Sequence, residues 1–108
     1  EKPISSSQTV QFGLVEMATE VKLGRTFVDK LIREHMEGEN VVVETSMAKY
    51  WTTDMVKRVA DRSLDFCGHF GILEKNRIAQ AWRDVRVMSI FAGTNEIMKN
   101  IAAKFMNL

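Results

Sequence analysis

Proline is almost absent from this sequence, and its absence restricts the fold more than any other feature. The one proline is Pro3, so residues 4–108 contain no residue that must break a helix. Six glycines interrupt stretches rich in Met, Leu, Ala, Lys, Arg and Glu, which are good helix formers. Clusters of turn residues do not recur at the spacing of roughly 8–12 residues that is typical of strands. The sequence therefore predicts an all-α fold.

The first half of the chain predicts two long helices. The first is expected to begin at Ser5, because Ser5 and Gln8 have the spacing of a capping box, and to end near Gly38. Its length would be roughly 45 Å at about 1.5 Å per residue. The second is expected from Asn40 to about Cys67, and apolar residues on more than one of its sides are typical of a central helix. One face of the first helix carries an apolar row: Val10, Leu14, Met17, Val21, Val28 and Leu31.

The second half predicts two short helices after a glycine turn at residues 68–71. One is expected over about Lys75–Met88. The other is expected to begin after Gly93, with Thr94 or Asn95 as its N-cap. Their predicted buried rows are Ile78, Ala81, Trp82 and Val85 in the first of these helices and Ile97, Ile101 and Phe105 in the second.

These four helices predict an incomplete four-helix up-down bundle, because short connections make neighbouring helices antiparallel. The two short helices cannot cover the whole length of the second long helix. We therefore expect an uncovered apolar face that meets another helix of a longer protein or another subunit. The alternative is a free-standing helical adaptor, which would be a folded monomer.

Length and charge exclude several classes of protein. A chain of 108 residues fits one domain, taken here as residues 1–108, and a net charge of +1 gives no reason to expect nucleic-acid binding. No apolar run approaches the roughly 20 residues needed to span a bilayer. The first residues do not resemble an export signal, and the single cysteine, Cys67, cannot form an internal disulfide. We therefore expect a cytoplasmic protein.

Few residues indicate chemistry by themselves. Cys67 and His69 offer too few donors for a zinc site, so no metal site is predicted, and no pair of carboxylates is placed for acid–base catalysis. The most informative segment is Ile90–Ile97, where a small residue, a glycine and a threonine open a helix. Such a turn can aim backbone N–H groups at a phosphate or a carbonyl oxygen, or it can simply cap the helix.

The most specific motif includes that turn. Residues Ala81–Met98 resemble the signature near the carboxyl end of acyl-CoA dehydrogenases, which reads RDaRvxxIxxGTxEI in one-letter code. Three earlier segments also resemble the family, in the order that the family has them, and extend the resemblance over nearly the whole chain. They are Gln8 with Leu14–Met17, the helix segment Met47–Trp51, and the glycines Gly68 and Gly71.

The resemblance implies the carboxyl-terminal helical domain of an oxidoreductase of fatty acid metabolism, without the first helix of that domain. Full-length members of the family bind FAD and oxidise the Cα–Cβ bond of an acyl-CoA thioester. A carboxylate removes the α-proton and the β-hydrogen leaves as hydride to the flavin. Electron-transfer flavoprotein then accepts the electrons, and most members are homotetramers. We accordingly expect acyl-CoA, electron-transfer flavoprotein and further copies of the chain, as a dimer or tetramer, to be the partners.

The resemblance also implies site residues, each with a structural alternative. Gln8 would approach the nucleotide portion of FAD or serve as a capping partner, and Gly93 would approach the acyl thioester. A turn at the end of the second helix would contact the FAD of a neighbouring subunit, although Phe66 and Cys67 could instead belong to the core. Thr94 could combine helix capping with a contact to the phosphate and ribose region. The implied FAD contacts are Gln8, Asp65, Phe66, Cys67, Gly68, His69, Thr94, Asn95 and Glu96.

Two departures from the family pattern affect these expectations. Many members have the catalytic glutamate where this chain has Ala92. In the branch of long-chain and isovaleryl enzymes, the glutamate lies on an earlier helix instead. No catalytic residue is therefore assigned, and the isolated chain is expected to be inactive. In the turn at the end of the second helix, Asp65 replaces a glutamine and His69 replaces a glycine, which weakens the case for a flavin contact there. The alternative is a degenerate relative that serves as an oligomerisation or protein-interaction module.

Overall fold

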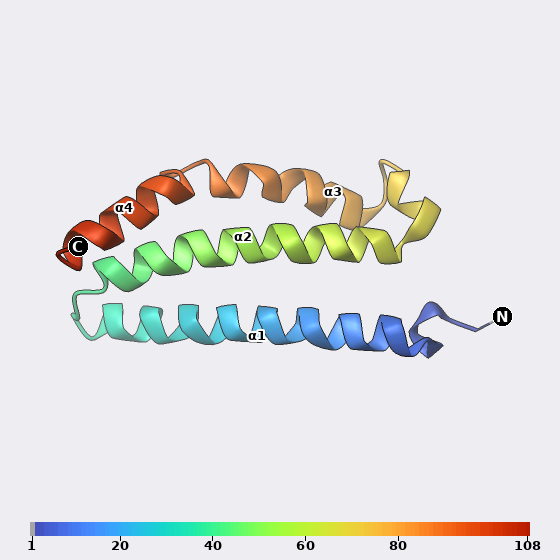
Figure 1. Ribbon diagram of the computed structural model, residues 1–108, viewed down its shortest axis with the longest axis horizontal. Coiled ribbons are helices and arrows are strands. Elements are labelled where there is room, and N and C mark those ends of the chain that lie inside the picture. Colours follow the sequence, from blue (N-terminus) through green and yellow to red (C-terminus); the bar gives the residue numbers. More distant parts are fainter. Residues whose placement is uncertain (1) are drawn as a thin grey trace.

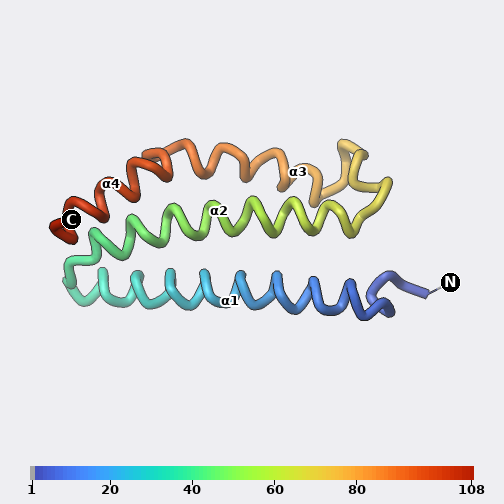
Figure 2. The backbone as a smooth tube through the Cα atoms, in the orientation of Figure 1, coloured from blue at the N-terminus to red at the C-terminus, as the bar shows by residue number. Residues whose placement is uncertain are grey.

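The computed structural model describes residues 2–108, and it contains four α-helices and three short 3-10 helices but no strand over those residues (Figures 1 and 2). The molecule is an elongated rod of 56 × 25 × 24 Å. The predicted all-α fold with two long and two short helices is confirmed. In chain order the elements are η1 (Ile4–Ser6), α1 (Gln8–Met36), α2 (Val42–Phe66), η2 (Gly68–Ile72), α3 (Arg77–Asp84), η3 (Val85–Ser89) and α4 (Asn95–Phe105).

The helix α2 is the centre of the fold. Figure 1 shows α1 along one side of α2 and the series α3, η3 and α4 along the other, so that three antiparallel layers result. The predicted central position of the second helix is confirmed. Because α1 and α4 lie on opposite sides of it, α2 is the element that fixes where the start of α4 lies.

The contact between α1 and α2 depends on small residues. Gly13 and Gly24 are both buried on the side of α1 that faces α2. A Cβ atom at Gly13 would lie 2.7 Å from the ring of Phe66, and one at Gly24 would lie 3.2 Å from the ring of Trp51. The two glycines therefore leave room for aromatic side chains of α2, and Met17 is buried between them on the same face of α1.

The beginning of α1 differs from the prediction. A 3-10 turn occupies residues 4–6, and α1 begins at Gln8 with Ser7 as an N-cap whose side chain accepts no capping hydrogen bond. The capping box between Ser5 and Gln8 is therefore not formed. Instead, the side-chain amide of Gln11 donates to the carbonyl oxygen of Ser5 at 2.8 Å, which ties the 3-10 turn to the helix.

The third helix is shorter than the predicted span of Lys75–Met88. Asn76 caps α3 by accepting hydrogen bonds from the backbone N–H groups of Ile78 and Ala79, and the helix narrows to the 3-10 form from Val85 onwards. Burial also differs, because only Ala79 and Val85 are buried here. The predicted burial of Ile78, Ala81 and Trp82 is wrong, since α3 packs only against α2 and its two 3-10 neighbours, which cover one narrow strip of its surface.

The last helix also buries a different face from the one predicted. Asn95 and Ala102 are the buried residues of α4, whereas Ile97 and Phe105 are exposed. The buried pair lies on one face at helical spacing, and this face meets α2. A polar residue at the start of α4 therefore has a stronger effect on the rotation of this helix than its apolar row.

The apolar surface left open lies mainly on α1 and not, as predicted, on α2. Val42 is the only large apolar side chain of α2 that is exposed. No large side chain among the described residues is fully buried, so the core is thin. None of the helices in residues 2–108 is long and apolar enough to cross a membrane. The exposed large apolar side chains of α1 are Phe12, Leu14, Val15, Val21, Leu23, Ile32 and Met36.

Candidate functional site

The turn between η3 and α4 is formed by two successive residues with left-handed backbone. Ala92 has a φ of 56° and Gly93 has a φ of 99°. A Cβ atom at Gly93 would lie 2.6 Å from the terminal methyl group of Met98. Glycine is therefore favoured at position 93 mainly by the backbone conformation, since the end of the flexible Met98 side chain could move aside, and the bare backbone stays accessible to a ligand.

Thr94, one of the two predicted N-cap residues, caps α4. Its hydroxyl oxygen accepts a hydrogen bond from the backbone N–H of Ile97 at 3.2 Å, and its φ and ψ are those of extended chain. Glu96 lies in the first turn and is exposed. The backbone N–H groups of a first helical turn have no acceptors within the helix, so this end of α4 can bind an anion.

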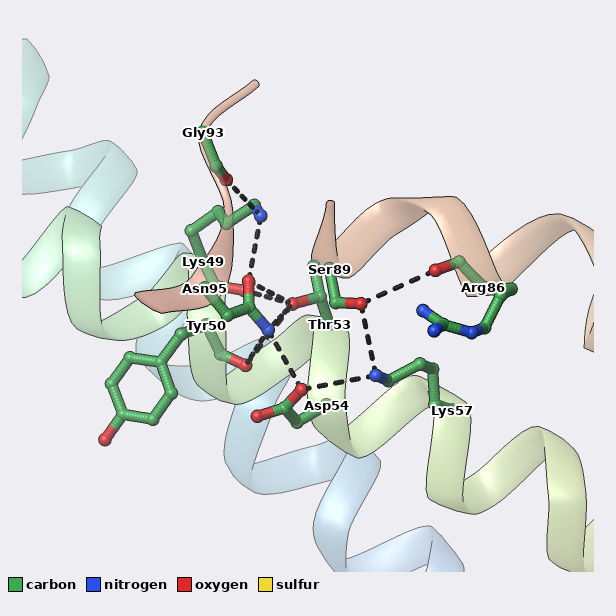
Figure 3. A network of polar contacts seen from close by, with 9 residues as sticks. All are labelled: Lys49, Tyr50, Thr53, Asp54, Lys57, Arg86, Ser89, Gly93 and Asn95. Carbon is green, nitrogen blue, oxygen red and sulfur yellow. Dashed lines mark hydrogen bonds and ion pairs between the residues drawn. The ribbon is translucent and has the colours of Figure 1, made fainter. Parts of the chain in front are cut away.

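A cluster of polar side chains on α2 holds the start of α4 in place (Figure 3). The ammonium group of Lys49 donates to the carbonyl oxygen of Gly93 at 2.7 Å and to Oδ1 of Asn95 at 2.8 Å. The Nδ2 of Asn95 donates to Oγ1 of Thr53 and to Oδ1 of Asp54, both at 2.9 Å. Asn95 is only 4% exposed. Its amide is thus fully bonded in the interior, where an unbonded amide would be costly.

The same cluster reaches the end of η3. Lys57 lies 3.6 Å from the carboxylate of Asp54 and donates to the hydroxyl of Ser89 at 3.1 Å. The hydroxyl of Ser89, a buried residue, in turn donates to the carbonyl oxygen of Arg86 at 3.4 Å. Both ends of the turn at residues 90–94 are therefore fastened to α2.

A polar hollow of about 290 Å³ opens beside this cluster. Three of the predicted residues, Thr94, Asn95 and Glu96, line it. Its three cations were not predicted from the sequence; they outnumber the two carboxylates and make the hollow favourable for an anion. The charged side chains that line it are Lys57, Arg86, Lys99, Asp54 and Glu96.

A signal for part of this cluster was present in the sequence. Lys49, Thr53 and Lys57 recur every four residues, so they share one face of the second helix, and Asp54 lies beside them. A polar row of this kind on a central helix is unusual and indicates a specific polar partner. The partner itself, Asn95, could not be identified from the row.

The second group of predicted residues forms the end of α2. Phe66 is half-buried against Gly13 of α1, and Cys67 is half-buried with its thiol 3.5 Å from the carbonyl oxygen of Ser63. Gly68 has a φ of 57°, as glycines that end helices commonly do. Asp65 and His69 are exposed. The turn therefore presents a carboxylate and an imidazole to solvent, with its aromatic residue used in packing.

The predicted residues thus fall into two separate regions. Gln8 begins α1 at the end of the rod where α2 finishes (Figure 1). The start of α4 is attached near Asp54, and from Asp54 to Phe66 the axis of α2 rises about 18 Å at about 1.5 Å per residue. Residues 93–96 and residues 65–69 therefore do not meet in one pocket of this chain.

Nothing in residues 2–108 gathers three or more His, Cys, Asp or Glu side chains that could hold a metal ion. At position 92 the turn offers a methyl group, which accepts no proton. The arrangement is thus suited to binding and not to acid–base chemistry.

The family model described as the carboxyl-terminal domain of acyl-CoA dehydrogenase matches residues 1–107. The chain belongs to the acyl-CoA dehydrogenase family. The sequence motif and the Gly-Thr turn are therefore features of a shared domain and not a chance resemblance.

Relatives of known sequence and structure agree with this assignment. The long-chain specific acyl-CoA dehydrogenase of Rattus norvegicus is 37% identical over 103 residues, which are 95% of this chain and 24% of that protein. The chain thus spans about a quarter of the length of the curated relatives it matches.

Solved structures of family members have the same fold. An acyl-CoA dehydrogenase from Geobacillus kaustophilus is 53% identical with a TM-score of 0.95, and the match covers 99% of this chain and 28% of that one. The butyryl-CoA dehydrogenase of Megasphaera elsdenii is 26% identical with a TM-score of 0.94, over 99% of this chain and 28% of that chain. The acyl-CoA dehydrogenase domain is thus reproduced over nearly the whole length of this chain.

Proposed function

We propose that this chain is the carboxyl-terminal helical domain of an FAD-dependent acyl-CoA dehydrogenase that forms a double bond between Cα and Cβ of an acyl-CoA thioester. The observation that carries the proposal is the Thr94-capped start of α4, which is fastened to α2 and opens onto a cation-lined hollow. The family assignment of residues 1–107 supports the same activity.

The hollow beside α4 fits the phosphate and ribose region of FAD. Lys57, Arg86 and Lys99 supply positive charge, and the hydroxyl of Thr94 and the first-turn N–H groups supply dipoles of the same sense. Glu96 and the backbone N–H of Asn95 would complete the contact to the ribose region, because the side-chain amide of Asn95 is already bonded within the fold. When bound, FAD would accept the hydride that leaves Cβ.

Gly93 would approach the acyl thioester. Because residue 93 has no side chain, its backbone can come close to the thioester. Proton removal would depend on a carboxylate outside this chain, since Ala92 has no group that accepts a proton. The role of these residues is therefore to bind and orient, and the isolated chain is expected to be inactive.

The second region would contact a different flavin, that of a neighbouring subunit. The separation of about 18 Å along α2 supports this division, because it lets one protomer face two cofactors at once. The segment from Asp65 to His69 would make this contact, with the glycine backbone at position 68 exposed to the ligand, and Gln8 would approach the nucleotide portion of FAD. This arrangement requires a homo-oligomer, either a dimer or a tetramer, with electron-transfer flavoprotein as the electron acceptor. A cytoplasmic location is part of this proposal.

A second candidate function is an oligomerisation or protein-interaction module that has lost flavin. The many exposed apolar side chains of α1 favour it, as does the carboxylate of Asp65 at a turn where a pyrophosphate would be repelled. It differs from the first candidate in leaving the cation-lined hollow without a ligand.

Purification of the intact protein that carries this domain distinguishes the two functions. The enzyme is expected to retain about one FAD per protomer and to reduce an acceptor dye only when acyl-CoA is added. A flavin-free protein that still forms a stable oligomer would contradict the first proposal and support the second.

A further inference from the structure

The orientation of the Gly93–Thr94 peptide is set from α2 and not from α4. Two left-handed residues precede Thr94, so the local backbone alone gives this peptide little restraint. Its carbonyl oxygen, that of Gly93, accepts a hydrogen bond of 2.7 Å from Lys49, a residue on the central helix. The peptide that begins the candidate flavin site is thus fastened by a side chain distant in sequence.

Lys49 has an unusual set of partners for a half-buried ammonium group. Both of its acceptors, the carbonyl oxygen of Gly93 and the amide oxygen of Asn95, are uncharged. The carboxylate of Asp54 is reached in this network only through the Nδ2 of Asn95. The positive charge of Lys49 is therefore directed at the Gly93 carbonyl instead of being neutralised by a direct ion pair.

An ammonium group on a peptide carbonyl has an electronic effect as well as a mechanical one. It draws electron density toward the carbonyl oxygen, which makes the N–H of the same peptide a stronger donor. In this chain that N–H belongs to Thr94. Charge-assisted hydrogen bonds of this kind are shorter and stronger than neutral ones.

Asn95 keeps Lys49 in position. Its oxygen accepts from Lys49, while its Nδ2 donates to Thr53 and Asp54 on the next turn of α2. Figure 3 shows these groups converging between α2 and the turn. Because the amide is buried and bonded on both of its sides, it has a single favourable orientation, and Lys49 keeps its acceptors.

We propose that Lys49 and Asn95 are positioning residues of the acyl-CoA dehydrogenase site, which fix the Gly93–Thr94 peptide against α2 and polarise its N–H toward the ligand. The inference rests on the proposed function, because that function supplies the ligand. Lys49 touches neither flavin nor substrate in this scheme, and it acts through the peptide.

The test uses the intact flavoprotein with Lys49→Met, which removes the charge but keeps a flexible side chain. The matched control is Lys104→Met, on the exposed last turn of α4. Lys49→Arg tests rescue, because it restores the positive charge and the donors. Hydrogen exchange at the backbone amides of residues 94 and 95, the visible spectrum of bound flavin, and kcat and KM for acyl-CoA are measured for each variant.

In Lys49→Met, amide exchange at residues 94 and 95 is expected to rise by about tenfold, because the fastening to α2 is lost. The flavin absorption bands are expected to shift, and kcat per bound flavin is expected to fall by about tenfold or more, because small misplacements in a site are costly. KM is expected to change by less than about threefold, since the hydrogen bonds of Lys49 are to peptide and not to substrate. Lys49→Arg should restore most of kcat, and Lys104→Met should resemble the wild type.

Three outcomes would overturn the inference. In the first, Lys49→Met matches Lys104→Met in exchange, spectrum and kcat. In the second, thermal stability falls while kcat per bound flavin is unchanged, which would make Lys49 merely structural. In the third, the wild-type protein holds no flavin, and the proposed function then fails together with the inference. If Lys49→Met does not fold, Asn95→Ser is subjected to the same three measurements and the same criteria.

Discussion

The two glycine-containing turns of this domain differ in how they are held. The turn before α4 is fastened at both ends by side chains of α2. The side-chain amide of Asn95, which follows this turn as the first residue of α4, is buried. The turn after α2 is held through the packing of Phe66 on α1, while Asp65 and His69 lie in solvent. Two motifs of similar appearance in sequence can thus be held very differently in the fold. The first turn is held rigidly by the central helix, whereas the exposed positions of the second turn can tolerate substitution.

The largest expected effect is at the buried amide. Asn95→Asp keeps an oxygen that can accept from Lys49, but it replaces Nδ2, the donor to Thr53 and Asp54, with a carboxylate oxygen that would face the carboxylate of Asp54 across the present 2.9 Å. Loss of the donors and burial of like charges should lower the free energy of unfolding by about 3 kcal/mol. Chemical denaturation of the intact protein measures the change.

The matched control for this change is Asn76→Asp near the second turn. Asn76 caps α3 at a more open position, and aspartate is an equally good N-cap, but the side chain of Asn76 also donates to the carbonyl oxygen of Phe70 at 3.1 Å, so a loss of about 1 kcal/mol is expected. Equal effects at positions 76 and 95 would show that the two turns are restrained alike.

The glycines give the next largest difference. Gly93→Ala forces a side chain into a φ of 99° and against the methyl group of Met98, so a loss of about 2 kcal/mol is expected. Gly68→Ala meets no atom within 4 Å and has a φ of 57°, so a loss of about 1 kcal/mol is expected. Thermal unfolding of the two variants side by side measures both, and the reverse ranking would contradict the comparison.

A smaller effect is expected at the helix caps. Thr94→Ala removes the hydroxyl that accepts from the N–H of Ile97 and should cost about 1 kcal/mol. Ser7→Ala at the start of α1 removes a hydroxyl that makes no capping hydrogen bond, so it should cost less than about 0.5 kcal/mol. Helix content followed by circular dichroism during denaturation checks the pair. A larger loss at Ser7 would mean that its hydroxyl caps α1 in solution.

The smallest change in stability is expected at the second turn itself. Asp65→Gln alters an exposed side chain and should change stability by less than about 0.5 kcal/mol. If this turn contacts a neighbouring flavin, removal of the carboxylate should raise the affinity for FAD by about threefold to tenfold. Titration of the apoprotein with FAD measures the affinity, and an unchanged value would separate this turn from the cofactor.

Local signals predicted much of the fold. The helix formers and the lack of proline gave the helices, and Thr94 was correctly identified as a cap because its hydroxyl acts within one turn. The capping box at Ser5 failed because the same serines can form a 3-10 turn with similar hydrogen bonds. Periodicity alone could not place the change from α3 to η3, since both forms accept the same residues.

The missed part of the site depends on contacts between residues distant in sequence. Lys49 and Asn95 meet only because α4 packs across α2. The buried bonds of Asn95 also explain why Ile97 and Phe105 face outward, because an unbonded amide in the interior would cost more than leaving two apolar side chains in water. A pattern of apolar residues cannot identify a buried polar residue that sets the orientation of a helix.

The thin core also determines where mutations will have their effects. Val15, Leu23 and Ile32 are 64%, 59% and 54% exposed, so their truncation removes little that this chain buries by itself. Inherited or engineered changes at these exposed positions of α1 should therefore leave the helices folded and act on contacts with other helices or subunits. Screens that score only the folding of these 108 residues would classify such changes as silent.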